Sequence, residues 1–141
     1  MDGEMREIEF RGKALISIEE LDEIGIKHKN GYVYGDLVDN SHIVTGILES
    51  NDEYICIETW CGIDSKTIGQ YTGLKDKNGK NIFEGDIGWD EHNECYGVVK
   101  FEEGKFLFVW ENIAEDLWEV ADVIEICGNI HENPELLEGT E

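Results

Sequence analysis

The sequence predicts an α+β fold that is mainly β, with a small barrel or roll in its second half. The 141 residues include sixteen glycines, many at turn-like positions, and only one proline, a composition that favours many short strands over Pro-rich linkers. Apolar and polar residues alternate in short, closely spaced runs, which is typical of antiparallel hairpins. No strand–helix–strand alternation is present, so a Rossmann-type sheet is not expected. Closing short strands into a barrel removes their exposed edges.

The chain is expected to open with a strand and a short helix. Residues 6–10 alternate polar and apolar residues, which predicts a strand with Ile8 and Phe10 facing inward. Ser17 and Glu20 then form the pattern of a capping box, in which the hydroxyl and the carboxylate satisfy backbone amides at a helix start.

Three further strands are expected before residue 60. Asn30-Gly31 supplies a turn in which both residues take positive φ, and Gly25 ends the preceding helix. The strands are predicted over residues 32–38, 42–48 and 53–59. In the last of them Ile55 and Ile57 share one face, because side chains alternate along a strand.

The second half of the sequence begins near Gly69 and is expected to be a compact set of strands. Asn78-Gly79 predicts a type I′ turn between two apolar segments. Residues 114–122 have a helical pattern, and Pro134 favours one terminal helical turn. Strands are expected over residues 96–101, 106–110 and 123–127. These elements divide the chain into an N-terminal α+β portion, residues 1–68, and a β-rich portion, residues 69–141.

The charge of the chain restricts its partners. Asp and Glu number 33 against 11 Lys and Arg, a net charge of −22. Such a surface repels nucleic-acid phosphates, which are bound through basic residues, so no nucleic-acid partner is expected. The charge can serve solubility alone, or it can form an acidic face for a basic host or phage protein. A decoy that mimics DNA belongs to this second class.

Neither the N-terminal residues nor any apolar stretch indicates a membrane or secretory route. The N-terminus has no basic segment followed by an apolar run, and no stretch approaches the roughly 20 apolar residues that span a bilayer. We therefore expect a cytoplasmic protein without a membrane partner, in which the four cysteines are reduced thiols.

Three segments of the chain together resemble the YopX family of phage and prophage proteins. They are residues 6–13, residues 68–87, which include Gln70-Tyr71-Thr72-Gly73-Leu74, and residues 126–137, which include Cys127-Gly128-Asn129-Ile130-His131. The resemblance implies a protein of the bacterial host cytoplasm with an SH3-like β-roll over about residues 69–137, preceded by a smaller α+β portion. It supplies no catalytic residues. The shared residues suit turns (Gly73, Gly79, Gly85 and Gly128) and core positions (Tyr71, Leu74, Ile82 and Ile87).

The cysteines and histidines are spaced as zinc ligands sometimes are, but we assign no metal, cofactor or catalytic residue. The pairs are Cys56 with Cys61, His92 with Cys95, and Cys127 with His131. No CxxC pair is present, and Cys56 and Cys127 lie in apolar strand patterns, where cysteine behaves as a small hydrophobe. A metal-dependent enzyme remains an alternative.

The candidate binding segment is the polar stretch between Asp86 and Tyr96, interpreted as the longest loop of the second half. Its candidate partner-binding residues are Asp86, Trp89, Asp90, Glu91, His92 and Glu94. The leading functional hypothesis is a non-enzymatic phage accessory protein that acts through protein–protein contacts, as a homo-oligomer. Self-association at this net charge requires an apolar interface or screening by salt.

Overall fold

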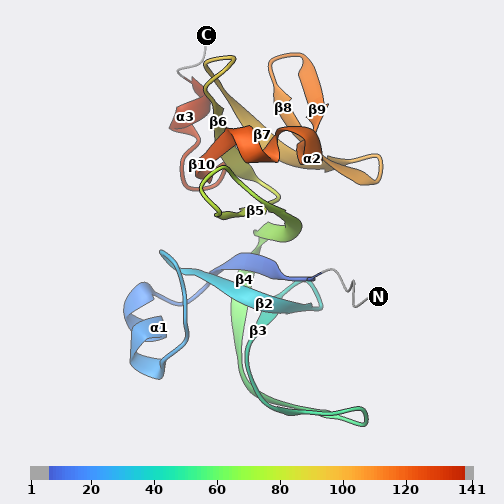
Figure 1. Ribbon diagram of the computed structural model, residues 1–141. Helices are drawn as coiled ribbons and strands as arrows, with labels where there is room; N and C mark the ends of the chain where they lie inside the picture. Colours follow the sequence, from blue (N-terminus) through green and yellow to red (C-terminus); the bar gives the residue numbers. More distant parts are fainter. Residues whose placement is uncertain (1–6, 139–141) are drawn as a thin grey trace. The chain divides into compact units, whose positions relative to one another are not determined.

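The computed structural model describes residues 7–138, which pack as two compact units, residues 7–70 and 71–138 (Figure 1). The sequence predicted a boundary between residues 68 and 69. In the structure, the boundary between the two compact units lies between Gln70 and Tyr71. None of the helices within residues 7–138 is long and apolar enough to cross a membrane. The fold is mainly β, as predicted, with two antiparallel five-stranded sheets.

The first unit contains one helix and four strands that form a closed ring of neighbours. Strand β1 pairs with both β2 and β4, while β3 lies between β2 and β4. Each strand of the ring therefore has two neighbouring strands, each along part of its length, which reduces exposed sheet edges. The elements are β1 (Phe10–Ala14), α1 (Ile18–Ile24), β2 (Tyr32–Val38), β3 (His42–Ser50) and β4 (Ile55–Lys75), the last of which continues into the second unit.

Strand β2 changes its neighbour at Gly35, and this change makes the ring possible. Residues 32–35 of β2 pair with β1, and residues 36–38 pair with β3. Gly35 has a φ of +155°, and a Cβ at this position would lie 1.9 Å from the Val44 carbonyl oxygen. Only glycine fits where the two backbones approach so closely.

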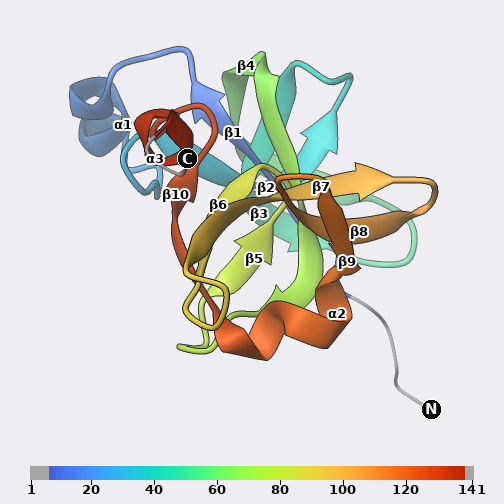
Figure 2. The same cartoon turned by 90° about the horizontal axis from the view of Figure 1, so that it is seen from above.

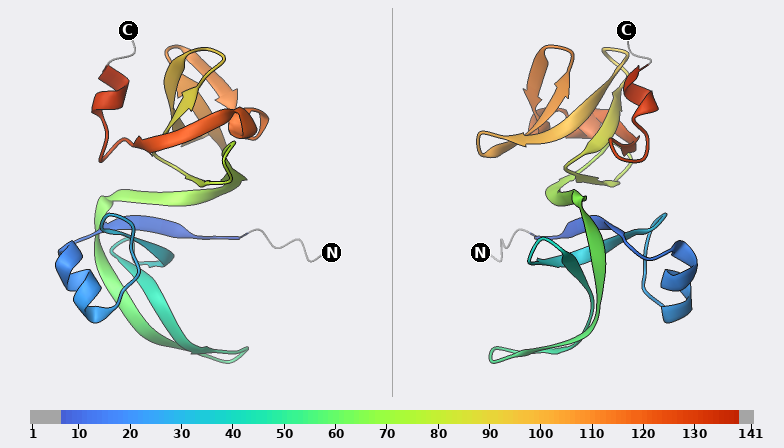
Figure 3. Two further views of the ribbon diagram at one scale, coloured as in Figure 1. Left: turned by 60° about the vertical axis from the view of Figure 1, so that its left-hand side comes forward. Right: turned by 180° about the vertical axis from the view of Figure 1, so that it is seen from behind.

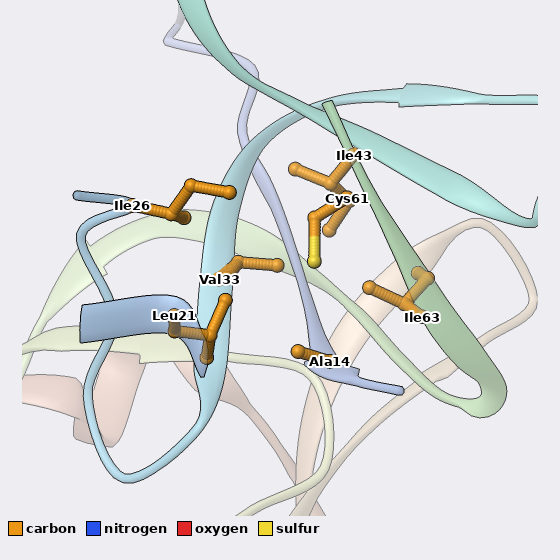
Figure 4. Packing of buried hydrophobic residues seen from close by; sticks show 7 residues of the cluster. All are labelled: Ala14, Leu21, Ile26, Val33, Ile43, Cys61 and Ile63. Carbon is orange, nitrogen blue, oxygen red and sulfur yellow. The ribbon is translucent and has the colours of Figure 1, made fainter. Parts of the chain in front are cut away.

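The ring encloses a core of small and branched side chains drawn from every element of the first unit. The side chains point toward one another, with those of the helix α1 region covering one side (Figure 4). Leu21 of α1 and Val33 and Ile43 of the strands are fully buried. The cluster consists of Ala14, Leu21, Ile26, Val33, Ile43, Cys61 and Ile63.

Local chemistry predicted the ends of helix α1 correctly. The Ser17 hydroxyl accepts a hydrogen bond from the Glu20 amide, and the Glu20 carboxylate accepts one from the Ser17 amide, so the capping box is complete. Gly25 ends the helix in the left-handed conformation with φ +80°. Asn30 and Gly31 both have positive φ and form the expected tight turn.

The start of the chain differs from the prediction. Strand β1 begins at Phe10, Ile8 is exposed, and Arg6 lies outside the described residues. Pairing with β2 and β4 decides where β1 lies, and that pairing involves residues 10–14.

The second unit is built on the sheet order β10-β6-β7-β8-β9 (Figure 2). Its core surrounds Phe108, whose ring is fully buried with Ile82 and Ile124. The elements are β5 (Asn81–Phe83), β6 (Asp86–Asp90), β7 (Cys95–Glu102), β8 (Lys105–Trp110), β9 (Ile113–Asp116), α2 (Leu117–Val120), the 3₁₀ turn η1 (Ala121–Val123), β10 (Ile124–Asn129) and α3 (Glu135–Glu138).

Two local predictions in the second unit were wrong. The turn at residues 76–79 is not type I′, because Gly79 has positive φ and Asn78 does not. Asp76 instead sets this turn, by accepting hydrogen bonds from the Asn78 and Lys80 amides. The helical segment expected at 114–122 is split, because residues 113–116 pair with β8 and only the following residues turn helically.

Candidate functional site

The residues predicted to form a binding loop do not lie in one loop. Asp86 and Asp90 are the ends of strand β6, both buried, and only residues 91–94 form the turn to β7. Asp86 accepts a hydrogen bond from the Phe83 amide at 2.8 Å. The Asp86 and Asp90 carboxylates are therefore buried and accept hydrogen bonds from backbone amides, so they are not exposed to a partner.

The rest of the predicted set is divided between a packed aromatic ring and an exposed turn. Trp89 packs edge-on against Tyr96 of the neighbouring strand, with 4.8 Å between ring centroids. Asp90 accepts hydrogen bonds from the His92 and Asn93 amides and from the Asn93 side chain, which fixes the turn. The structure exposes Glu91, His92 and Glu94 together, and this turn remains a predicted contact.

Two of the cysteines, Cys56 and Cys127, differ from the apolar environment predicted for them. Cys56 and Cys127 are exposed, whereas Cys61 and Cys95 are buried. Burial raises the pKa of the Cys61 and Cys95 thiols, and partial desolvation followed by the Glu125 charge raises the pKa of the Cys127 thiol, although its residue is exposed. These groups are therefore weaker nucleophiles at neutral pH than an ordinary thiol. Within residues 7–138, no three His, Cys, Asp or Glu side chains are grouped closely enough to hold a metal ion.

A projecting hairpin is the most unusual feature of the first unit. We call residues 46–59, the outer part of β3, the turn and the start of β4, the arm; it is the long curved teal-to-green hairpin of Figure 3. Asn51 closes its tip, because the Asn51 side-chain oxygen accepts hydrogen bonds from the Glu53 and Tyr54 amides at 2.8 and 3.1 Å. The arm is therefore a defined hairpin with a specified turn.

One face of the arm carries a row of exposed isoleucines. Ile47 lies opposite Ile57 in the β3–β4 register, and Ile55 shares their face because it lies two residues from Ile57 on the same strand. Ile47 is 46% exposed, Ile55 is 50% exposed and Ile57 is 38% exposed. We call Ile47, Ile55 and Ile57 the stripe. Leu48, the extra residue of a β-bulge, is 68% exposed beside it.

Both outer edges of the arm lack a neighbouring strand. In the part of the chain that the structure describes, β2 pairs with β3 only at residues 42–44, and β1 pairs with β4 only at residues 63–70. An isolated two-stranded ribbon is only marginally stable in water, and three strands with an apolar face are more stable. The arm is therefore suited to accept a further strand.

A hollow of about 290 Å³ lies at the root of the arm, and we call it the root hollow. Its walls include Gly46 and Ile47 of the arm and the carboxylates of Glu7, Glu9 and Asp36. Burial raises the pKa of Glu9, and the neighbouring Glu7 and Asp36 raise it further. A second hollow shares Glu9, Tyr34 and Thr45 with the first, and Lys27, His28 and Lys29 line its remaining walls.

Sequence reasoning found the alternation within this segment but not its exposure. The pattern predicted that Ile55 and Ile57 share a face, but alternation does not show whether that face is buried. The signal available in the sequence was charge. Residues 30–65 contain Asp36, Asp39, Glu49, Asp52, Glu53, Glu58 and Asp64 but no Lys or Arg.

Comparison with known proteins decides the family. The model of the YopX protein family matches residues 25–138. The chain belongs to the YopX family. The match includes the whole arm, whereas residues 6–13, which also resembled the family, lie before its start.

A solved structure extends the comparison of this YopX family protein to nearly the full chain. The crystal structure of protein EF1440 from Enterococcus faecalis is similar with a TM-score of 0.63 and 25% sequence identity. The similarity covers 94% of this chain and 99% of EF1440. No curated protein matches the chain. The comparisons therefore give a family and a fold and no biochemical activity.

Proposed function

We propose that this YopX family protein is a non-enzymatic accessory protein of a phage or prophage, and that it acts in the bacterial cytoplasm through protein–protein contacts made by the arm. The observation that carries this proposal is the stripe: three isoleucines on one face of a projecting hairpin, exposed in the described chain. Exposed contiguous apolar surface rimmed by polar residues marks interaction sites.

The arm also has the geometry of a docking element. Its tip is closed by Asn51, so it presents a defined surface rather than a random coil. Burying the exposed parts of the stripe would remove apolar surface from water, which favours association. The turn at Glu91, His92 and Glu94, which was also predicted as a contact, offers no apolar surface. We therefore propose the arm ahead of this turn as the contact surface.

The SH3-like roll expected from the family resemblance is part of the same proposal. The order β10-β6-β7-β8-β9 supports it, because the strand that follows the helical turn α2–η1 pairs with the first strand of that sheet. Such a roll provides a scaffold that hosts many functions, so it supports the proposed role without defining it.

The proposal is tested with a variant in which only the stripe becomes polar. In the stripe variant Ile47, Ile55 and Ile57 are each replaced by Thr, which is β-branched and keeps the strand preference of Ile. The control variant carries Val38→Thr and Ile113→Thr, two strand residues that are 47% and 43% exposed outside the arm.

The experiment compares proteins captured from host lysate by the immobilised full chain and both variants, quantified by mass spectrometry. We expect a protein that the wild type and the control variant retain and the stripe variant loses. Circular dichroism and urea unfolding verify that both variants remain folded. Equal capture by the stripe variant would contradict a role for the arm.

A further inference from the structure

The charge around the stripe restricts what can cover it. Glu49, Asp52, Glu53 and Glu58 are the charged residues of the arm, and all four are acidic. A partner that buries the stripe brings its own surface close to these carboxylates. Lys or Arg on that surface would gain Coulomb attraction, and Asp or Glu would be repelled.

The root hollow extends the negative surface from the arm to the ring of strands. Glu7, Glu9 and Asp36 lie around its walls, beside Ile47 of the stripe. None of these three carboxylates forms an ion pair with another described residue. Burial, followed by the charges of Glu7 and Asp36, raises the pKa of Glu9, and a cation beside Glu9 would offset the repulsion from those two charges.

The edges of the arm indicate the conformation of the partner. Leu48 is an extra residue on β3, and such a bulge disrupts the regular backbone of an edge. Strand β4 has its own extra residue, Glu58, between Ile57 and Thr59, but it is regular over Ile55–Ile57, and its outer edge has no described neighbour there. An extended segment can pair with that edge, and its alternate side chains then extend the stripe.

Three other occupants fit the same surface less well. A nucleic acid would place phosphates against the four arm carboxylates, which is unfavourable. A second copy of the chain, aligned arm to arm, would place those same carboxylates against each other. An apolar segment without charge would leave the negative rim uncompensated.

We propose that the arm binds an extended segment of a basic protein as a third strand on the outer edge of β4, with apolar side chains beside the stripe and Lys or Arg near the surrounding carboxylates. This inference rests on the proposed function and adds to it the charge and the conformation of the partner. The partner segment is therefore a β-strand in which apolar residues alternate with Lys or Arg.

The test uses the full chain and a library of random peptides of about ten residues, a length that spans one added strand. Peptides displayed on yeast are selected on the wild-type protein and then sorted against the stripe variant. We expect the enriched peptides to alternate apolar residues with Lys or Arg. Their affinity, measured by fluorescence anisotropy, should fall by more than about tenfold in the stripe variant and stay unchanged in the control variant.

Two further readouts separate strand addition from general charge attraction. Bound peptide should slow hydrogen exchange of the backbone amides of residues 55–57, because an added strand protects an edge. Binding should also weaken as salt is raised, while peptides attracted only by net charge would bind the stripe variant equally well.

Each other outcome overturns a defined part of the inference. Stripe-dependent peptides without enrichment of Lys and Arg would overturn the basic partner and leave the proposed function standing. Peptides that bind the stripe variant equally, or no enrichment at all, would overturn both. Sedimentation velocity gives the remaining outcome: a wild-type dimer that the stripe variant fails to form would assign the stripe to a second copy and overturn the basic partner.

Discussion

Asp76 shows how one buried carboxylate can organise a unit of this chain. Its Oδ1 accepts hydrogen bonds from the Asn78 and Lys80 amides, and its Oδ2 accepts one from the Ile126 amide, each at 2.9 Å. Burial alone raises the pKa of Asp76, but these three amides and the Lys80 charge outweigh burial and hold the pKa below its usual value. The carboxylate thus joins a turn to strand β10, fifty residues away in sequence.

Replacing Asp76 with Asn should destabilise the protein by about 2 kcal/mol, because the amide nitrogen of Asn cannot accept a hydrogen bond and leaves a buried donor unsatisfied. The measurement is the free energy of unfolding in urea at neutral pH. Asp122→Asn is the control, since Asp122 is exposed and a change there should leave stability within about 0.5 kcal/mol of wild type. Equal stability of the two variants would contradict the role of Asp76.

The stabilisation from Asp76 should depend on pH in one direction. Its pKa is lower in the folded state than in the unfolded state, so the contribution is complete above the unfolded value of about 3.9. It is lost as pH falls through the folded pKa. We therefore expect the difference in unfolding free energy between wild type and Asp76→Asn to shrink below about pH 4. A difference that stays constant or grows in acid would contradict this assignment.

Gly35 should tolerate no side chain. Gly35→Ala places a methyl group against the Val44 carbonyl, so we expect a loss of more than about 2 kcal/mol from the clash and the backbone shift. Gly62→Ala is the matched control, because its new Cβ would meet side-chain atoms no closer than 3.5 Å. The free energy of unfolding in urea is measured for both variants. Equal losses of stability would contradict the requirement for glycine where β2 approaches β3.

At the scale of elements, the residues that act on their immediate neighbours were predictable. Ser17 and Glu20 specify a helix start by their own hydrogen bonds, and Asn30-Gly31 specifies a turn by its backbone preference. Strand β4 was not predictable, because it changes partner from β3 to β1 to β5 along its length. The second half was predicted to begin near Gly69, but β4 continues through this position because it pairs with β1 there.

The interpretation of residues 86–96 as one loop was wrong for a related reason. A run of polar residues with two aspartates indicates a loop, yet Asp86 and Asp90 are buried because backbone amides donate to their carboxylates. The exposure of the stripe was equally hidden, since alternation predicts which residues share a face and does not show whether another layer covers that face.

The arm should open more readily than the strands around it. It has two strands, a marginal arrangement, whereas β7 lies between β6 and β8 in the middle of a sheet. We expect backbone amides of residues 46–59 to exchange with deuterium faster than those of β7, measured by mass spectrometry on the free protein. Slow exchange in the arm would indicate that its face is already covered, as in a dimer.

The whole molecule carries a net charge of −22, and this charge should oppose folding. Compact folding brings like charges together, and salt screens their repulsion over a Debye length of about 10 Å at 0.1 M. We therefore expect the melting temperature to rise when sodium chloride is increased from about 0.01 M to about 0.5 M. A melting temperature that is unchanged or lower in salt would contradict self-repulsion as a significant cost.

The exposed position of Cys56 makes the arm accessible to optical measurement. Its thiol lies between Ile55 and Ile57 in sequence and therefore points to the opposite face from the stripe. A fluorophore attached there would sit close to an arriving strand without occupying its place. Replacing Cys127, the other exposed cysteine, with Ser leaves Cys56 as the accessible attachment point within the described residues. The chain therefore contains a natural reporter position for the surface whose partner is sought.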